Sequence, residues 1–554
     1  MAAPAATALG DLAQPALAQE AAQGAARNWR HATSLFGDVK YPAGFKHFDY
    51  VNVNAPKGGM ARMIAFGTFD NFNMVVGGVK GSIVGGIDQI YDTLLVQSLD
   101  EVSTEYGLLA DALDYPADFS WVRYRLRPNA KWHDGTPVTA ADCVASLRRW
   151  GARDALGKML LTATASLDAT DVRTFRFALK EPFPLMLEVL GKPNAPLPVM
   201  MPARLAATPP DQRIPEPVGS GPFRFVKNEW RPGNTMLLER NPDYVPRSEA
   251  PDFLAGGKKV KIDQLTLRVM PDQSTGANAL MQGEIDYMQY LPFDMLPVLE
   301  REKALKFIGL GGIHQFQGNF RLNHEAPPFN NPAVRRILWK LVDQDATLTA
   351  IGVPEKYRAK SCPSFFMCGA PLSTEAGSAG NSFDMAAAKA ELAASGYKGE
   401  PVIILEVSGS ISQTASKLLV QNMRDIGFTV EQQPRDWPTV LARRAKKEGW
   451  SMFPVYSNGT DMFSPLSHFY IANTCSPDYP GWSCDERIPK SRKAFTQAST
   501  LEERRRIAAD IQAAAYELTP SVMWGQFTIP AGYRGNLKGL IQSSYPMFWE
   551  VERT

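Results

Sequence analysis

The stretch that decides the fold class is "VRYRLRPNAKWHDGTPVTAADCVASLRRW", residues 122–150. Val122, Tyr124 and Leu126 alternate with arginines, and this two-residue period predicts a strand with one buried face. The Asp-Gly pair at 134–135 is typical of a turn. The first half of the stretch is therefore expected to be a strand that leads into a tight turn.

The second half of the stretch and two later segments predict helices. Thr139 and Asp142 have the spacing of a capping box, so a helix is expected to begin there. Another helix is expected to begin at Ser499, with Glu502 in the reciprocal position. Residues 411–427 predict an amphipathic helix that ends at its final glycine, with a strand directly after it. Because strands and helices alternate in this way, we expect an α/β architecture.

Size and charge limit the classes of protein that remain. With 554 residues, the chain exceeds what one hydrophobic core usually organises, so two or three domains are expected. Its 59 Lys and Arg residues nearly balance 57 Asp and Glu residues, for a net charge of +2. This balance provides no general field for a polyanion, so no nucleic acid partner is expected. Because no run of about 18 apolar residues occurs, no transmembrane helix is expected either.

The N-terminal residues indicate export. Residues 2–26 are rich in Ala, Gly and Gln, and Ala16, Leu17 and Ala18 form a cleavage signal of the A-x-A type. We interpret residues 1–27 as the remnant of an export signal and expect them to be disordered. A natural disordered leader is the alternative.

Four of the five cysteines form two closely spaced pairs, Cys362 with Cys368 and Cys475 with Cys484. Both pairs lie in loop-like segments that contain Pro or Gly, and neither has the paired CxxC spacing of a zinc site. Two short-loop disulfides are therefore expected, with Cys143 as a free, buried thiol. Disulfides of this kind persist in an oxidising compartment, which again indicates an exported protein.

Four sequence blocks follow one another along the chain. They are "GLLADAL" with residues 124–146 of the opening stretch, "GSGPFRF" with "ERNPDYV", "LMQGEIDYM", and "RLNHEAPPFNNPAVRRILWKLVDQDAT". In this order they resemble the family 5 extracytoplasmic solute-binding proteins of ABC importers, the group that binds oligopeptides, dipeptides or nickel. The N-terminal segment "LFGDVKYPAGFKHFDYVNVNAPKGG" is similar to the microcin- and oligopeptide-binding branch of that family.

The resemblance implies a type II periplasmic-binding-protein fold, with two hinged α/β lobes and an extra domain on the first lobe. The ligand would be enclosed when the lobes close. The protein would be a periplasmic receptor, neither an enzyme nor a cofactor protein, that delivers its ligand to an ABC permease in the inner membrane. We expect a monomer. The expected division is lobe I at 28–75, its extra domain at 76–213, lobe I again at 214–308, lobe II at 309–526 and a return to lobe I at 527–554.

Peptide-binding members of this family hold the ligand's ammonium with an aspartate that follows an aromatic strand end, and that position matches Asp461. It lies in "FPVYSNGTDMFSP", where the pair Asn458-Gly459 predicts a tight turn with positive φ. A carboxylate suits an ammonium enclosed in a cleft, because a charge-assisted hydrogen bond replaces the lost hydration. The simpler alternative is that Asp461 caps the turn or pairs with a surface base.

Other candidates are expected to line the same cleft, as apolar walls or as polar contacts. Around one of them, Glu406, the segment "ILEVSGSISQTAS" contains no Arg or Lys before Lys417, so the cation that holds a dipeptide's carboxylate is missing. The ligand is therefore expected to be longer than a dipeptide, to lack a free carboxylate or to carry positive charge. The candidate ligand-binding residues are Asp461, Tyr456, Asn458, Phe453, Phe66, Gly67, Thr68, Phe69, Trp437 and Glu406.

Motifs of other functional classes do not occur in the sequence. It contains no Walker A motif, G-x-S-x-G elbow or H-E-x-x-H pair, and its six histidines include no pair at i, i+4. Two alternatives to a peptide receptor stay open. One is a receptor of the same fold for a metal chelate, an opine or sugar conjugate, or haem. The other is a chaperone-like protein that holds unfolded peptide segments.

Overall fold

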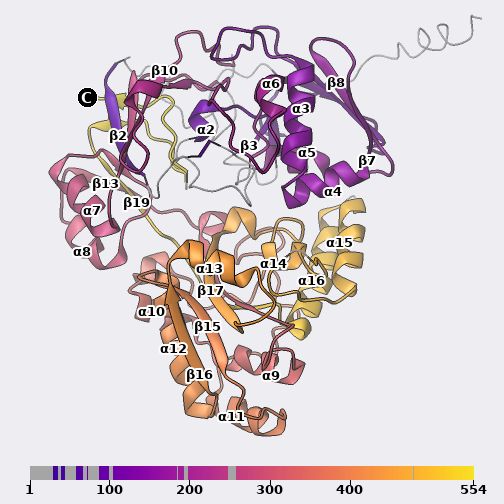
Figure 1. Ribbon diagram of the computed structural model, residues 1–554, viewed down its shortest axis with the longest axis vertical. Coiled ribbons are helices and arrows are strands. Elements are labelled where there is room, and N and C mark those ends of the chain that lie inside the picture. The colour runs from indigo at the N-terminus through magenta and orange to yellow at the C-terminus, as the bar shows by residue number, and fades with distance from the viewer. Residues whose placement is uncertain are drawn as a thin grey trace, which may run out of the picture.

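The computed structural model contains two α/β bodies, one above the other in Figure 1. The upper body holds the N-terminal half and the C-terminus of the chain, and the lower body holds the part between them. The described residues are 29–34, 39–43, 58–65, 71–72, 87–98, 104–183, 185–192, 197–247, 257–477, 479–498, 500–543 and 545–554. Outside these described residues lie the expected leader, residues 1–27, and the candidates Phe66, Gly67, Thr68 and Phe69.

A seven-stranded mixed sheet forms the centre of the upper body, in the order β13-β19-β12-β2-β11-β10-β9. Strand β2 runs parallel to β11 and β12, whereas the other neighbours are antiparallel. The sheet includes a strand from near the C-terminus, β19, between β12 and β13. The chain therefore returns to the upper body after it has built the lower one. The strands are β2 (Met60–Ala65), β9 (Phe223–Phe225), β10 (Thr235–Arg240), β11 (Gln264–Val269), β12 (Tyr287–Met288), β13 (Leu305–Ile308) and β19 (Ala531–Arg534).

Beside this sheet lies a four-stranded antiparallel sheet, β5-β6-β8-β7, packed against α3 and α4. Strand β6 carries the expected alternation, with Val122, Tyr124 and Leu126 fully buried. The capping box of Thr139 and Asp142 is confirmed at the start of α3. The strands are β5 (Ala110–Asp114), β6 (Trp121–Leu126), β7 (Thr164–Ala169) and β8 (Thr174–Leu179); a small sheet contains β1 (Ala32–Ser34), β4 (Thr104–Gly107) and β3 (Leu95–Gln97), and a two-stranded ribbon contains β20 (Leu537–Lys538) and β21 (Glu552–Arg553).

The lower body is built on a five-stranded sheet in the order β16-β15-β17-β14-β18. Strands β16, β15 and β17 are parallel, and β14 is antiparallel to both of its neighbours. The amphipathic helix expected at 411–427 is confirmed as α12, and Gly427 ends it in the left-handed conformation with φ of 113°. The strands are β14 (Phe316–Leu322), β15 (Val402–Val407), β16 (Val430–Arg435), β17 (Met452–Asn458) and β18 (Ser521–Phe527).

Helices cover the sheets of both bodies (Figure 1). In the upper body they are α2 (Ile87–Ile90), α3 (Ala140–Gly151), α4 (Ala155–Ala163), α5 (Met186–Gly191), α6 (Ala203–Ala206), α7 (Gln273–Gln282) and α8 (Leu296–Leu299). In the lower body they are α9 (Pro332–Ile337), α10 (Gln344–Ile351), α11 (Met385–Ala394), α12 (Ile411–Ile426), α13 (Trp437–Arg444), α14 (Phe469–Ala472), α15 (Arg487–Gln497) and α16 (Leu501–Leu518).

Two local expectations are wrong. The helix expected from Ser499, which lies outside the described residues, begins at Leu501, because the side chain of Thr500 accepts the capping hydrogen bond from the backbone of Glu503. The glycine of the Asn458-Gly459 pair does not serve a positive-φ turn. A Cβ at Gly459 would lie 2.6 Å from the carbonyl oxygen of Ile313, so close packing explains this glycine.

Two connections between the bodies lie side by side. The hydroxyl of Thr528, just after β18, donates to the carbonyl of Leu310 at 2.8 Å and accepts from the amide of Gln315 at 3.2 Å. Both partners belong to the connection between β13 and β14. The two connections are therefore coupled, as hinge strands are expected to be.

Candidate functional site

The edge of the lower sheet that faces the upper body carries four of the six candidate residues that the structure describes, Asp461, Tyr456, Asn458 and Trp437. Strands β16, β15 and β17 are parallel, so their carboxyl ends share one edge. Helix α13 begins at this edge, directly after β16, and lies on the side of the lower body nearest the upper body (Figure 1). In open α/β sheets, ligands characteristically bind outside the carboxyl ends of the strands.

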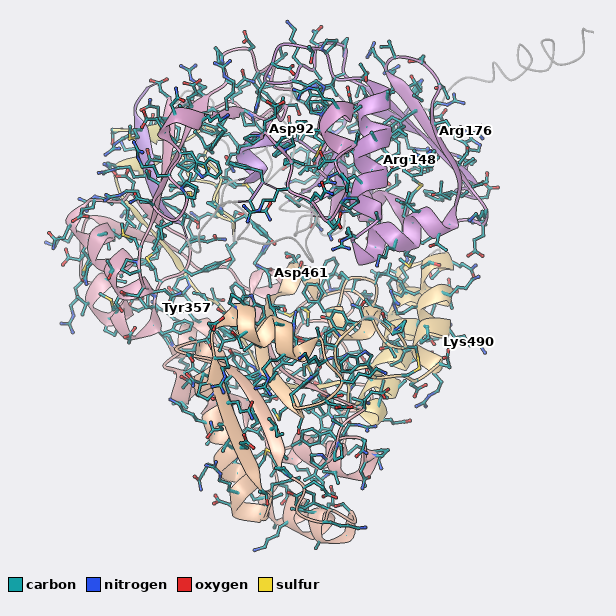
Figure 2. The ribbon with its side chains drawn as sticks, in the orientation of Figure 1. Asp92, Arg148, Arg176, Tyr357, Asp461 and Lys490 are labelled. Carbon is teal, nitrogen blue, oxygen red and sulfur yellow. A yellow bond between two sulfur atoms is a disulfide. The ribbon has the colours of Figure 1, made fainter. Side chains whose placement is uncertain are left out.

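Asp461 is held at this edge by a short, well-bonded loop. Asn458, the last residue of β17, accepts hydrogen bonds through its side chain from the backbone N–H of Thr460 at 3.1 Å and from its hydroxyl at 2.9 Å. The backbone N–H of Gly459 donates to Gln315 at 2.7 Å. Asp461 then closes the 3-10 turn Gly459–Asp461. Figure 2 shows Asp461 at the boundary between the two bodies.

The carboxylate of Asp461 is buried and only partly compensated by its surroundings. Its Oδ1 atom is shielded from solvent and has no hydrogen-bond partner among the described residues. Burial raises the pKa of Asp461 to about 7, and the opposing charge of Lys192 in the upper body lowers the pKa only in part. A buried carboxylate without a partner is costly, and a ligand cation would remove that cost. The cap of the turn is Asn458, and no described base forms an ion pair with Asp461.

Aromatic rings surround this carboxylate. The ring of Tyr456, on β17, lies 5.6 Å from that of Phe316 and 6.0 Å from that of Phe527. Phe316 in turn lies 5.8 Å from Tyr290 of the upper body. Burial, and then the charges of Tyr456 and Asp461, raise the pKa of Tyr290, so both groups lie within electrostatic reach of its hydroxyl. The structure thus brings Tyr456 to Asp461, and it adds Tyr290, which the sequence did not suggest.

Trp437 lies at the same edge, at the first position of α13. Its side chain is 41% exposed, and the guanidinium of Arg444 lies 5.3 Å from the ring centroid. An exposed tryptophan with a cation on its face is suited to apolar or peptide contact. Trp437 therefore stays a candidate for the ligand-binding surface.

Phe453 and Glu406 are placed inside the lower body rather than beside Asp461. Phe453 is buried in a cluster with Leu405, Val440 and Trp450. The carboxylate of Glu406 accepts hydrogen bonds from three internal side chains, and the residue is 1% exposed. These donors are Ser416, Gln432 at 2.9 Å and Gln413 at 3.3 Å. The hydrogen-bond partners of Glu406 thus come from its own body, on α12 and β16.

The cysteines behave as expected. Cys362 is bonded to Cys368 and Cys475 to Cys484, whereas Cys143 is free and buried. Across the part of the chain that is described, the group with metal-ligand spacing is Cys475, Cys484 and Glu486, but its two sulfurs are already bonded to each other. None of the described helices combines the length and apolarity needed to cross a bilayer.

Two coupled α/β bodies, with a buried carboxylate at the sheet edge between them, define the class of hinged solute-binding proteins. The chain belongs to the bacterial extracellular solute-binding proteins of family 5, whose model, described as the middle region of that family, matches residues 105–480. The fold is the type II periplasmic-binding-protein fold that the resemblance implied. The residue boundaries expected for the lobes and the extra domain stay predictions.

Known proteins similar to the chain share this architecture. A relative from Sinorhizobium fredii, named a probable peptide ABC transporter periplasmic-binding protein, is 32% identical over 84% of this chain and 88% of its own length. The Helicobacter pylori periplasmic binding protein DppA, solved with the peptide STSA, superposes with a TM-score of 0.75 at 20% identity, over 90% of this chain and 98% of DppA. AgaA from Agrobacterium tumefaciens R10, solved with agropinic acid, has a TM-score of 0.71 at 20% identity, over 90% of this chain and 99% of AgaA.

Proposed function

We propose that the protein is the periplasmic receptor of an ABC importer, which encloses a peptide or a peptide-like amine between its two bodies and delivers it to the permease. The observation that carries the proposal is the Asp461 carboxylate, buried at the interbody edge with Oδ1 unpartnered among the described residues. Family membership, and the peptide named for the Sinorhizobium relative, support it. The proposal includes the absence of catalysis, a monomeric state and the lobe boundaries expected from the sequence.

The role of Asp461 gives this function its physical basis. An ammonium that leaves water needs a charged hydrogen-bond acceptor, and a carboxylate with a shielded, unpartnered oxygen supplies one at no further cost in desolvation. Tyr456 and Tyr290 would exclude water from that contact, and Trp437 would line the ligand farther along the edge. A longer peptide can be held through its main chain, without a protein cation that binds its terminal carboxylate. This agrees with the segment around Glu406, where the carboxylate of Glu406 is bonded to uncharged side chains.

The test combines identification of the ligand with one substitution. Small molecules released from purified protein by denaturation are identified by mass spectrometry, and their affinities are measured by calorimetry. Asp461→Asn keeps the shape but removes the charge, so an amine-bearing ligand should bind about 10- to 100-fold more weakly, the value of a charge-assisted hydrogen bond.

Asp425→Asn, an exposed carboxylate on α12, is the matched control and should bind normally. Unchanged affinity in Asp461→Asn would contradict the anchoring role. Release of an opine, a metal chelate or haem instead of a peptide would assign the alternative receptor function, which the fold of AgaA also accommodates. Saturable, lobe-closing binding of one small ligand would exclude a chaperone-like role.

A further inference from the structure

A second acidic pocket lies next to Asp461, also between the two bodies. On one side it is formed by β3, β4 and α5 of the upper body, and on the other by the residues that flank Asp461 in the lower body. Its volume is about 50 Å³, enough for about four water-sized groups. Among its lining residues are Gln97, Glu105, Glu188, Lys192, Thr460 and Phe463.

Glu105 is the least expected of these residues. It lies on β4, is 2% exposed, and its Oε2 atom has no hydrogen-bond partner within the described chain. The end of α5 makes room for this carboxyl group, since a Cβ at Gly191 would lie only 1.9 Å from Oε2. Burial, and secondarily the charge of Glu188, raise the pKa of Glu105 well above its usual value. The fold therefore encloses an acidic group that it does not itself satisfy.

The two described cations of this neighbourhood also bond to groups outside the pocket. The ammonium of Lys192 lies 2.7 Å from Asp154, and both side chains are at most 10% exposed. Burial lowers the pKa of Arg504, and the nearby charge of Glu188 opposes this shift; the guanidinium donates to the backbone carbonyl of Ala498. Four carboxyl groups, those of Asp154, Glu105, Glu188 and Asp461, thus meet two cations.

We infer that this pocket binds a positively charged side chain of the ligand, so that the substrates are peptides with Lys or Arg close to the N-terminus. The inference rests on the proposed peptide function and deepens it. Thr460 and Phe463 line the pocket and flank Asp461 in the chain, so a ligand whose α-ammonium is held by Asp461 has its first side chains beside the pocket. The pocket volume suits an ammonium or guanidinium group with its adjoining methylenes. Glu105 and Glu188 supply the charge-assisted hydrogen bonds that such a group needs once it is desolvated.

The test compares peptides that differ only in one charge. Three tetrapeptides carry a single Lys at position 1, 2 or 3 in an alanine background, and three matched peptides carry the uncharged norleucine instead. At one of these positions, calorimetry should show that the lysine peptide binds at least about tenfold more tightly than its norleucine counterpart. In the Glu105→Gln, Glu188→Gln double variant that preference should disappear, while the affinity for the norleucine peptide is unchanged.

Two controls keep the result interpretable. Glu188→Gln alone changes only a half-buried side chain and should reduce the preference partly, even if the double variant folds poorly. Asp168→Asn, an exposed carboxylate on β7, should leave the preference intact. Equal binding of Lys and norleucine peptides by the wild type, or a preference that survives in the double variant, would overturn the inference but not the peptide function. Failure of all six peptides to bind would overturn both.

Discussion

Asp461 imposes a cost on the ligand-free protein. Its folded pKa of about 7 lies above the ordinary value of 3.8, because burial disfavours the charged form. Sites that bind charged ligands commonly sacrifice stability in this way, and removal of the charge then stabilises the empty fold while it abolishes function. The resemblance of the sequence pointed to Asp461, but not to Lys192, Glu105 or Tyr290. Those residues come from segments far away in the chain, and only the packing of the two bodies brings them to the site.

This cost predicts a pH dependence of stability. Between pH 3.8 and about 7 the folded chain keeps a proton on Asp461 that the unfolded chain has released. The free energy of unfolding therefore falls as the pH rises through this window. Without ligand, the free energy of unfolding of Asp461→Asn should equal that of the wild type near pH 4. At pH 8 it should be larger by on the order of 1 to 3 kcal/mol. Denaturant unfolding of both proteins at the two pH values measures this. A difference that does not change with pH would show that Asp461 is ionised throughout.

At the scale of single elements, local patterns predicted the structure well where local chemistry decides it. The alternation in β6, the capping box of α3 and the glycine that ends α12 are all in place. The start of α16 was displaced because Ser499 and Thr500 are both good caps, each with a glutamate three residues later. At Gly459 a positive φ was expected, but the glycine is required because the carbonyl of Ile313, distant in the chain, leaves no room for a Cβ atom. Contacts of that kind leave no trace in the local sequence.

The two disulfides cross-link loops of the lower body, and we expect them to contribute measurably to its free energy of unfolding. They join residues 6 and 9 positions apart. Replacement of Cys475 and Cys484 by alanine should lower the free energy of unfolding of that body by about 2 kcal/mol, since a short loop is released in the unfolded chain. Chemical denaturation followed by tryptophan fluorescence measures the change.

Counting thiols gives an independent check of the same pairing. Alkylation of the denatured protein followed by intact-mass measurement should label one thiol before reduction, that of Cys143, and all five after it. Labelling of five thiols without reductant would show that the bonds do not form.

At the scale of the whole molecule, both apolar and polar contacts of the described residues cross the boundary between the two bodies. Lys493 of α15 pairs with Glu181 at 2.9 Å, although both side chains are more than half exposed. The hydroxyls of Thr460 and Tyr545 lie 3.1 Å apart across the same boundary. Exposed ion pairs contribute little, typically below about 1 kcal/mol, so the pair of Lys493 and Glu181 adds little to closure, and an enclosed ligand is expected to favour it.

The proposed enclosure of a ligand between the bodies predicts that the ligand controls the overall dimensions. In solution scattering, the radius of gyration should be smaller for the ligand-saturated protein than for the protein stripped of ligand. Asp461→Asn should require about 10- to 100-fold more ligand for the same change, in proportion to its loss of affinity. Identical scattering with and without a ligand that calorimetry shows to be bound would rule out closure.

The position of β19 has a consequence for how the molecule is made. Residues 531–534 supply the strand between β12 and β13, so the upper sheet has an empty place until this late segment joins it. The lower sheet, in contrast, takes all its strands from the continuous stretch 316–527. The lower body can therefore mature while the upper one waits, and the cell must protect an unfinished sheet from aggregation until the last strand arrives.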